Sequence, residues 1–271
     1  MNGFTSFNDS WFQQLHRLVQ QLSSCPKHPT TTEHQHHFLH VINKVMSHYA
    51  EYYHVKSLAA EQDALSVFVA PWATTLERSL HWIGGWRPTT AFHLVYSEAS
   101  IHFEAHIIDI LRGFRTGDLG DLSPAQFRRV SELQCETVKE ENAISEELSE
   151  WQDGVSELMG SSTDLDVKTV QLISVLKKAD DLRLRTVRKV VDLLTPQQAV
   201  EFLIAASELH FGVRGWGLTQ DHLIFHMASG NPDLTKTPKR RSSTSRKVRL
   251  VAKIGGAADP DAKVSGEVSW I

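Results

Sequence analysis

The stretch from Pro71 to Pro88 has the sequence PWATTLERSLHWIGGWRP, and it decides how this chain folds. It contains three tryptophans and two adjacent glycines between two prolines. Because proline suits the first turn of a helix, the stretch predicts a short helix that begins at Pro71. Its apolar face is expected to contain Trp72, Leu76, Leu80 and Ile83. Gly84 or Gly85 is expected to take the left-handed conformation that ends the helix, and Pro88 keeps the helix from resuming.

Apolar residues on both sides of this stretch recur every three or four positions, which is typical of amphipathic helices. A first helix is expected from about Phe7 to Leu22, with Asp9 and Ser10 as caps near its start. A second helix is expected from about Phe38 to the break before Pro71. The tryptophan-rich stretch itself is then either a buried helix end with aromatic packing or the signature of a family.

Two later segments carry nearly the same helix-start signal, Leu122-Ser-Pro-Ala-Gln126 and Leu194-Thr-Pro-Gln-Gln198. In each, a hydroxyl residue is expected to cap the helix, proline takes the first helical position, and the last glutamine completes a capping box. The first of these helices is predicted to run to about Met159. The second is predicted to end at three glycines, Gly212, Gly215 and Gly217.

No stretch alternates apolar and polar residues for long enough to predict a strand. The expected fold is therefore all-α, an antiparallel bundle of long helices over residues 7–227, followed by a disordered basic tail over residues 228–271. The tail carries nine Lys/Arg and four Asp/Glu, whereas the rest of the chain carries 19 and 28. An acidic body is not typical of a broad DNA-binding surface, so any attraction to nucleic acid is expected to come from the tail.

Several function classes find no support in the sequence. No apolar run is long enough to cross a membrane, and no secretory signal begins the chain. The two cysteines, Cys25 and Cys135, indicate thiols in a reducing compartment. There is no nucleophile elbow and no phosphate-binding glycine loop, so no catalytic residue is predicted and the protein is not expected to be an enzyme. The carboxylate pairs Glu140/Glu141 and Glu146/Glu147 are expected to lie on solvated helix faces.

Histidine is abundant, with fifteen copies. Three pairs are spaced four apart, which places both rings on one helical face where a zinc or copper ion could bridge them. These pairs are His36/His40, His102/His106 and His222/His226. Fifteen histidines in a helical protein produce such pairs by chance, so solvated histidines are expected and no metal site is predicted.

Two segments suggest contacts with other macromolecules. The segment Asp9-Ser10-Trp11-Phe12 either packs onto the bundle or leaves one face free to anchor a partner protein. The basic cluster in the tail resembles a two-part nuclear import signal, with a solubilising tail as the alternative. Its cations are Lys236, Lys239, Arg240, Arg241, Arg246, Lys247 and Arg249.

Together these features resemble the plant Delay of Germination domain family, whose domain also forms the C-terminal part of TGA-type basic-leucine-zipper factors. The main matching residues are Trp72, Glu77, Arg78, Trp82, Ile83, Gly84, Gly85, Arg87 and Pro88. Further matches are Leu122–Gln126, Ala179–Arg183 with Thr186, Leu194–Pro196, Leu209, His210, Trp216 and Gly217. The resemblance spans about Phe7 to His222. Because no basic region or leucine heptads precede the domain, the chain looks like a stand-alone dormancy-type member.

The resemblance implies a non-enzymatic regulator of seed dormancy and abscisic acid signalling that binds type 2C protein phosphatases. In that branch the phosphatase-contacting element is an N-terminal motif of aspartate, serine, an aromatic and a hydrophobic residue. The opening of that motif is matched by Asp9, Ser10, Trp11 and Phe12. Gln13 and Gln14 depart from its acidic and aromatic ending.

The dormancy-type branch also has a haem-binding histidine pair, four apart, in the last helix. His210 fits the first position, but Arg214 occupies the second, and His222 or His226 could substitute only if the helix bends back. A haem-binding sensor is therefore one alternative function. Another is a transcription-associated protein of the TGA-related class, with sequence-specific DNA binding and transcription factors as partners. The nucleus, and also the cytoplasm, are the expected locations; homo-oligomerisation and direct DNA contact stay open.

Overall fold

The computed structural model describes residues 2–26, 31–156 and 162–228, and in that part of the chain it contains helices and no strand. This confirms the all-α class. The elements are α1 (Asn2–Ser23), α2 (Thr32–Gln62), α3 (Ala64–Val69), α4 (Thr75–Ser79), α5 (Thr90–Leu111), the 3-10 helix η1 (Leu119–Asp121), α6 (Pro124–Ser156), α7 (Ser162–Leu193) and α8 (Pro196–Ala228). The tail and its basic cluster, Lys236 to Arg249, lie outside the described residues.

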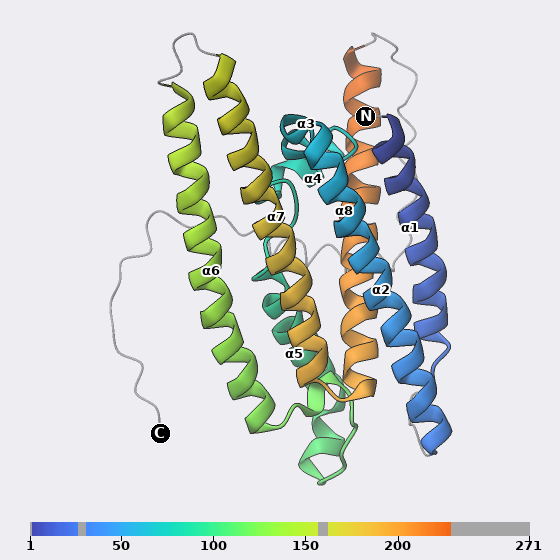
Figure 1. The fold of residues 1–271 in the computed structure, drawn as a ribbon. Coiled ribbons are helices and arrows are strands. Elements are labelled where there is room, and N and C mark those ends of the chain that lie inside the picture. Colours follow the sequence, from blue (N-terminus) through green and yellow to red (C-terminus); the bar gives the residue numbers. More distant parts are fainter. Residues whose placement is uncertain (1, 27–30, 157–161, 229–271) are drawn as a thin grey trace.

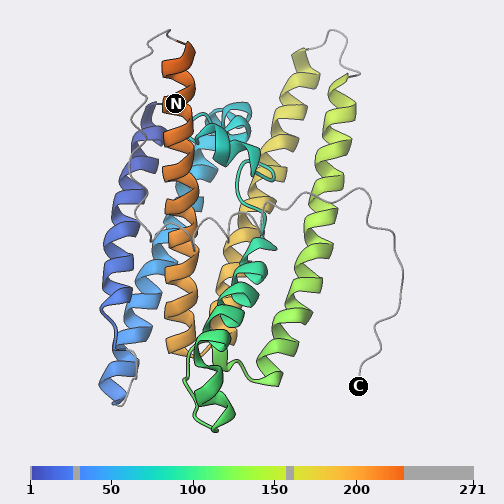
Figure 2. The same ribbon diagram turned by 180° about the vertical axis from the view of Figure 1, so that it is seen from behind.

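The long helices lie side by side as an elongated bundle (Figure 1). Helix α6 packs on α7 at one edge, while α1, α2 and α8 pack on one another at the other edge, and α2 also contacts α7. The short helices α3 and α4 lie between α7 and α8 near one end of the bundle, and α5 and η1 lie toward the other end (Figure 2). None of the described helices has a stretch that is both apolar enough and long enough to span a bilayer.

Two apolar clusters fill the bundle. The larger one joins α1, α2, α5 and α8 around fully buried side chains such as Leu15, Phe92 and Leu203. The smaller one joins α2, α3 and α7 around Val67 and Leu172, and includes residues from the loop after α4 and from α6. The tryptophan-rich stretch therefore runs across the interior of the bundle between the two clusters.

Both predicted capping boxes are present. Ser123 Oγ accepts from the Gln126 amide at 3.2 Å, and Gln126 Oε1 accepts from the Ser123 amide at 3.0 Å. Thr195 and Gln198 repeat these bonds at 3.3 and 3.0 Å. The two glutamines then meet, because Gln126 Nε2 donates to Gln198 Oε1 at 2.8 Å. The two start signals thus hold the beginnings of α6 and α8 together.

Several expected helix boundaries are wrong. The helix predicted from Pro71 begins instead after Thr74, because Thr74 and Glu77 form a capping box of their own. Asp9 and Ser10 are not caps, since α1 already begins at Asn2 and the Ser10 hydroxyl donates to the Ser6 carbonyl within the helix. The helix expected from Phe38 to the break before Pro71 is divided at Asp63, whose carboxylate caps α3.

The three glycines of α8 do not end that helix, which runs on to Ala228. A side chain at Gly217 would overlap Thr74, so this glycine marks the place where α8 and the start of α4 approach closely. Nothing lies within 4 Å of a side chain built at Gly212 or Gly215. A glycine weakens a helix by about 1 kcal/mol but does not stop it when tertiary packing holds it.

Candidate functional site

The loop from Trp82 to Trp86 has an unusual backbone. Gly84 has a φ of 67°, so the left-handed conformation predicted at this glycine pair is present. It does not end the helix as predicted, because α4 already ends at Ser79 with Leu80 as its C-cap. Ile83 also has a positive φ, of 48°, and its side chain is buried. A β-branched residue rarely adopts this region, and such a conformation persists only where its surroundings impose it.

Two buried cations impose the conformation of this loop. Arg183 donates from Nε to the Trp86 carbonyl at 2.6 Å and from Nη2 to the carbonyls of Trp82 and Ile83. Lys56 donates from Nζ to the Gly84 carbonyl at 2.8 Å. Carbonyls that would otherwise be buried without a donor are thereby satisfied.

Asp180 supplies the opposite charge. Its Oδ1 accepts from Lys56 at 2.9 Å and from Arg183 at 2.5 Å, and all three side chains are almost completely buried. Burial lowers the pKa of Lys56 to about 8, although the neighbouring Asp180 charge acts in the opposite direction. We call Lys56, Asp180 and Arg183 the loop clamp. Asp180 and Arg183 belong to the segment that carried the family resemblance, so that segment has a structural role here.

A second buried carboxylate fixes the end of the same stretch. Glu141 on α6 is 1 % exposed and accepts from Arg87 Nε at 2.8 Å and from the Thr89 amide at 2.7 Å. The expectation that Glu141 lies on a solvated face is therefore wrong. Pro88 is buried between these partners, whereas Arg78 is exposed and does not contact them.

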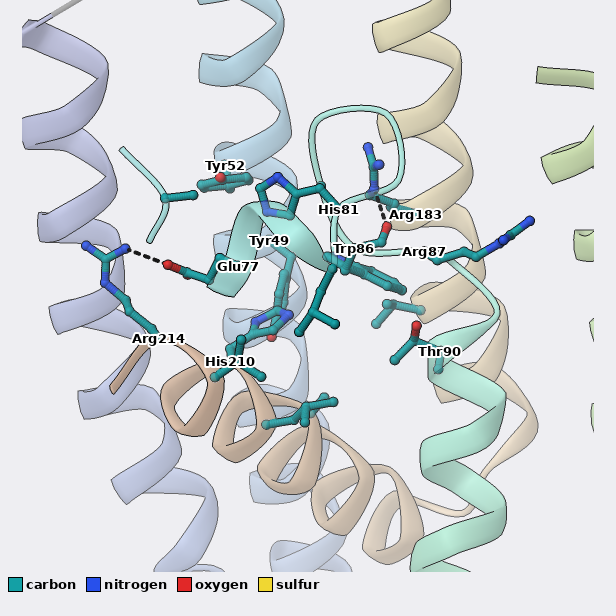
Figure 3. Close-up of a pocket in the computed structure, with 18 of the residues that line it drawn as sticks. Tyr49, Tyr52, Glu77, His81, Trp86, Arg87, Thr90, Arg183, His210 and Arg214 are labelled. Carbon is teal, nitrogen blue, oxygen red and sulfur yellow. Dashed lines mark hydrogen bonds and ion pairs between the residues drawn. The ribbon is translucent and has the colours of Figure 1, made fainter. Parts of the chain in front are cut away.

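A cavity of about 360 Å³ lies beside the loop. Side chains from α1, α2, the 72–93 stretch, α7 and α8 surround it (Figure 3). Aromatic side chains contribute to its wall from several elements, namely Trp11, Phe12, Tyr49, Tyr52, Tyr53, Trp72, Trp86 and Phe202. Its dimensions lie within the range of small-molecule pockets, about 300–1,000 Å³.

Two buried polar atoms of this wall have no hydrogen-bond partner, Asn8 Nδ2 and His210 Nδ1. Burial lowers the pKa of His210 to about 4, so its ring is neutral near pH 7. Burial also raises the pKa of Tyr49 to about 12. Because unpaired buried polar groups are rare in proteins, this constellation suits an apolar molecule that carries a hydrogen-bonding group.

The predicted partner-binding segment borders this cavity. Trp11 is 5 % exposed, stacks on the His48 ring at 4.9 Å and donates from Nε1 to the His48 carbonyl at 3.0 Å. Phe12 is partly buried, whereas Asp9 and Ser10 are exposed. The sequence left two alternatives for this segment, packing onto the bundle or leaving one face free. In the structure its aromatic residues pack onto the bundle.

Arg214 joins the segment to the signature stretch. Its Nη1 lies 3.6 Å from Glu77 Oε2 (Figure 3). Its Nη2 donates to Asp9 Oδ1 at 2.7 Å, and its guanidinium lies 4.6 Å from the centre of the Phe12 ring. Three segments that are far apart in sequence therefore meet at one rim.

The geometry does not fit a haem held by two histidines. His210 faces the cavity, but Arg214 in the second position is a cation committed to two carboxylates and cannot ligate iron. His222 and His226 cannot substitute, because α8 continues as one helix and carries them to an exposed place where their Nε2 atoms lie 3.0 Å apart.

Sequence reasoning missed Lys56, Glu141 and Asn8. A usable signal existed for the first two, because each falls on the apolar face of its helix. Lys56 follows Tyr49 and Tyr53 at helical spacing, and Glu141 follows Thr137 in the same way. A charged residue on a buried face predicts a partner, although not which partner.

Comparisons with known proteins agree with this structure. Residues 14–97 match the family DOG1, described as seed dormancy control. The Arabidopsis thaliana protein DOG1-like 4 is 29% identical over 82% of this chain and 95% of its own length. The protein RESPONSE TO ABA AND SALT 1 of the same plant is 26% identical over 78% of this chain and 93% of its own length.

A more distant relationship reaches transcription factors. TGA5 of Arabidopsis thaliana is 26% identical over 72% of this chain but only 57% of its own length. This pattern is the one that the sequence motifs predicted, with dormancy-type proteins matched along most of their length and TGA factors in part. The chain is therefore similar to DOG1-like proteins along most of its length, and residues 14–97 match the seed dormancy control family.

Proposed function

We propose that this protein is a non-enzymatic regulator of seed dormancy and abscisic acid signalling that acts by binding partner proteins, type 2C phosphatases first among them. The match to the seed-dormancy family and the similarity to a protein named for its response to abscisic acid support this role. The described residues offer a rim and a cavity for binding, and the sequence offers no nucleophile set. We place the protein in the nucleus, and also in the cytoplasm, on the basis of the basic cluster and the TGA relatives.

One observation supports the exposed face of α1 around Asp9 as the docking surface. Asp9 holds its carboxylate at an exposed position through Arg214, while the neighbouring Trp11 anchors α1 in the bundle. Ser10, Gln13 and Gln14 are exposed nearby. In this proposal the exposed residues contact the phosphatase, and Trp11 is a positioning residue that keeps α1 in place.

A pull-down with a purified type 2C phosphatase tests this surface. Ser10→Arg adds bulk and charge at an exposed position, and Gln20→Arg makes the same kind of change about 15 Å further along the same helix. We expect the wild type and Gln20→Arg to capture the phosphatase and Ser10→Arg to lose most of the capture. Equal capture by all three, with equal circular dichroism, would show that this surface is not the docking site.

A second candidate is a transcription-associated role, because the TGA relatives contain the same domain. In that case the protein joins DNA-bound complexes with transcription factors, and its basic cluster supplies nuclear entry or direct DNA contact. Salt-sensitive DNA binding that disappears when residues 229–271 are deleted would favour this role. Binding that survives the deletion would exclude the tail as its source.

A further inference from the structure

The loop before α6 folds back on the second half of α5 and brings three metal-ligating side chains together. His102 and His106 lie on α5, and Asp118 caps η1. Their ligand atoms all lie within 4.8 Å of one another. Asp118 Oδ2 lies 3.0 Å from His102 Nδ1 and 3.4 Å from His106 Nδ1. The sequence pairs the two histidines, whereas only the fold adds the aspartate.

The backbone is shaped for this approach. A side chain at Gly120 would come within 2.7 Å of the Phe103 amide nitrogen and 2.8 Å of the His102 carbonyl carbon, so only glycine lets η1 lie against α5. Helix α5 is itself kinked at His106, where φ is −117° and ψ is 15°. Both features bring the η1 segment and the two rings into contact.

The carboxylate of Asp118 is oriented by its own partners. Its Oδ1 accepts from the Thr116 hydroxyl at 2.6 Å and from the Gly120 amide at 2.9 Å. These bonds leave Oδ2 facing the two imidazoles. Metal-binding carboxylates are commonly fixed in this way by hydrogen bonds to the oxygen that does not bind the metal.

Both rings make contacts that a metal bond would replace. His102 Nδ1 forms a hydrogen bond of 3.0 Å with Asp118 Oδ2, and His106 Nδ1 lies 3.1 Å from the His102 carbonyl oxygen. An ion that enters the site takes the place of the proton shared between His102 and Asp118. A second carboxylate, that of Glu201, adds negative charge near the site. It is held there because its Oε2 accepts a hydrogen bond of 2.8 Å from the Leu119 amide.

We propose that His102, His106 and Asp118 bind one divalent transition-metal ion, with Zn²⁺ as the physiological ion and water in the fourth position. Two imidazoles exclude Mg²⁺ and Ca²⁺, which require oxygen ligands, and suit zinc. Ligand atoms about 3.3 Å apart are what a tetrahedral ion with bonds of about 2.0–2.1 Å needs. The two separations between Asp118 and the histidines, 3.0 and 3.4 Å, are close to this value. The histidine side chains are 29% and 41% exposed, so the ion has a route to the site.

Cobalt titration of the full chain provides the test, because Co²⁺ in a tetrahedral site absorbs strongly in the visible. We expect one equivalent of Co²⁺ to produce this band and Zn²⁺ to displace it. His106→Gln removes one exposed ligand without disturbing the core and is expected to weaken binding by at least about 10-fold. The double variant His222→Gln/His226→Gln removes a histidine pair on α8 whose Nε2 atoms lie 3.0 Å apart, and it serves as the matched control, with the band unchanged.

Thermal unfolding gives an independent measurement, because an ion that binds only the folded chain raises the melting temperature. Zn²⁺ is expected to raise it for the wild type and the control variant and not for His106→Gln. A hydrogen bond between His102 and Asp118 without any metal predicts no cobalt band at all, and that result would overturn the proposal. So would a band that His106→Gln retains and the control variant loses.

Discussion

Arg214 on the last helix and Asp9 on the first form an ion pair of 2.7 Å at the rim of the cavity. From the sequence, these residues belonged to two separate hypotheses, a haem pair and a phosphatase motif. The pair shows why an arginine at the second histidine position is compatible with this fold. Its guanidinium fastens α1 to α8 and also lies over the Phe12 ring.

A double-mutant cycle on Asp9→Ala and Arg214→Met measures this pair. Asp9 is 56% exposed, so solvent screening limits the coupling, and we expect about 0.5–1 kcal/mol. Arg214→Met alone is expected to cost more than Asp9→Ala, because Arg214 also contacts Glu77 and Phe12. Urea unfolding of the single and double variants gives all four values, and strictly additive effects would contradict the coupling.

Arg183→Met is expected to destabilise the protein by about 3–5 kcal/mol, because it leaves several loop carbonyls buried without a donor and leaves Lys56 as the remaining partner of the buried Asp180. Arg185→Met is the matched control on the same helix. Arg185 forms partly exposed pairs with Glu140 and Asp181, so its loss is expected to cost less than about 1 kcal/mol. Similar free energies of unfolding for the two variants would mean that the clamp does not hold the loop.

Substitution by alanine is expected to have opposite effects on stability at two glycines of α8. Gly215→Ala meets nothing within 4 Å and is expected to stabilise the helix by about 0.5–1 kcal/mol. Gly217→Ala would collide with Thr74 and is expected to destabilise the protein by about 1–3 kcal/mol. Melting temperatures of the two variants test this, and a shared direction of change would show that α4 does not lie against Gly217.

His210 makes stability depend on pH. Its pKa is about 4 in the folded chain, because of burial, and about 6.5 when exposed. The unfolded state therefore binds more protons between these values, so stability is complete above about pH 6.5 and is lost as the pH falls toward 4.

His210→Leu removes this dependence. Between about pH 7 and pH 5 the variant is expected to lose about 2 kcal/mol less stability than the wild type. His81, whose pKa is also lowered to about 4 by burial, keeps part of the acid sensitivity in both proteins. Denaturant unfolding at the two pH values gives the comparison, and parallel losses would place His210 in contact with water.

The sequence by itself determined the features that depend on neighbouring residues. The caps at Ser123 and Thr195, the left-handed turn at Gly84 and the helical class follow from local backbone preferences and apolar spacing, and the structure has all of them. The same local signals carried the resemblance to dormancy-type proteins that the comparisons found.

Only the tertiary structure decided which of those residues meet. The burial of Lys56 and Glu141, the continuation of α8 through its glycines, and the approach of Asp118 to His102 all depend on segments distant in the chain. The physical reason is that residue type alone does not determine whether a charged side chain is buried or whether a helix ends at a glycine. What packs against the residue determines whether a charged side chain is paired and buried, and whether a helix continues.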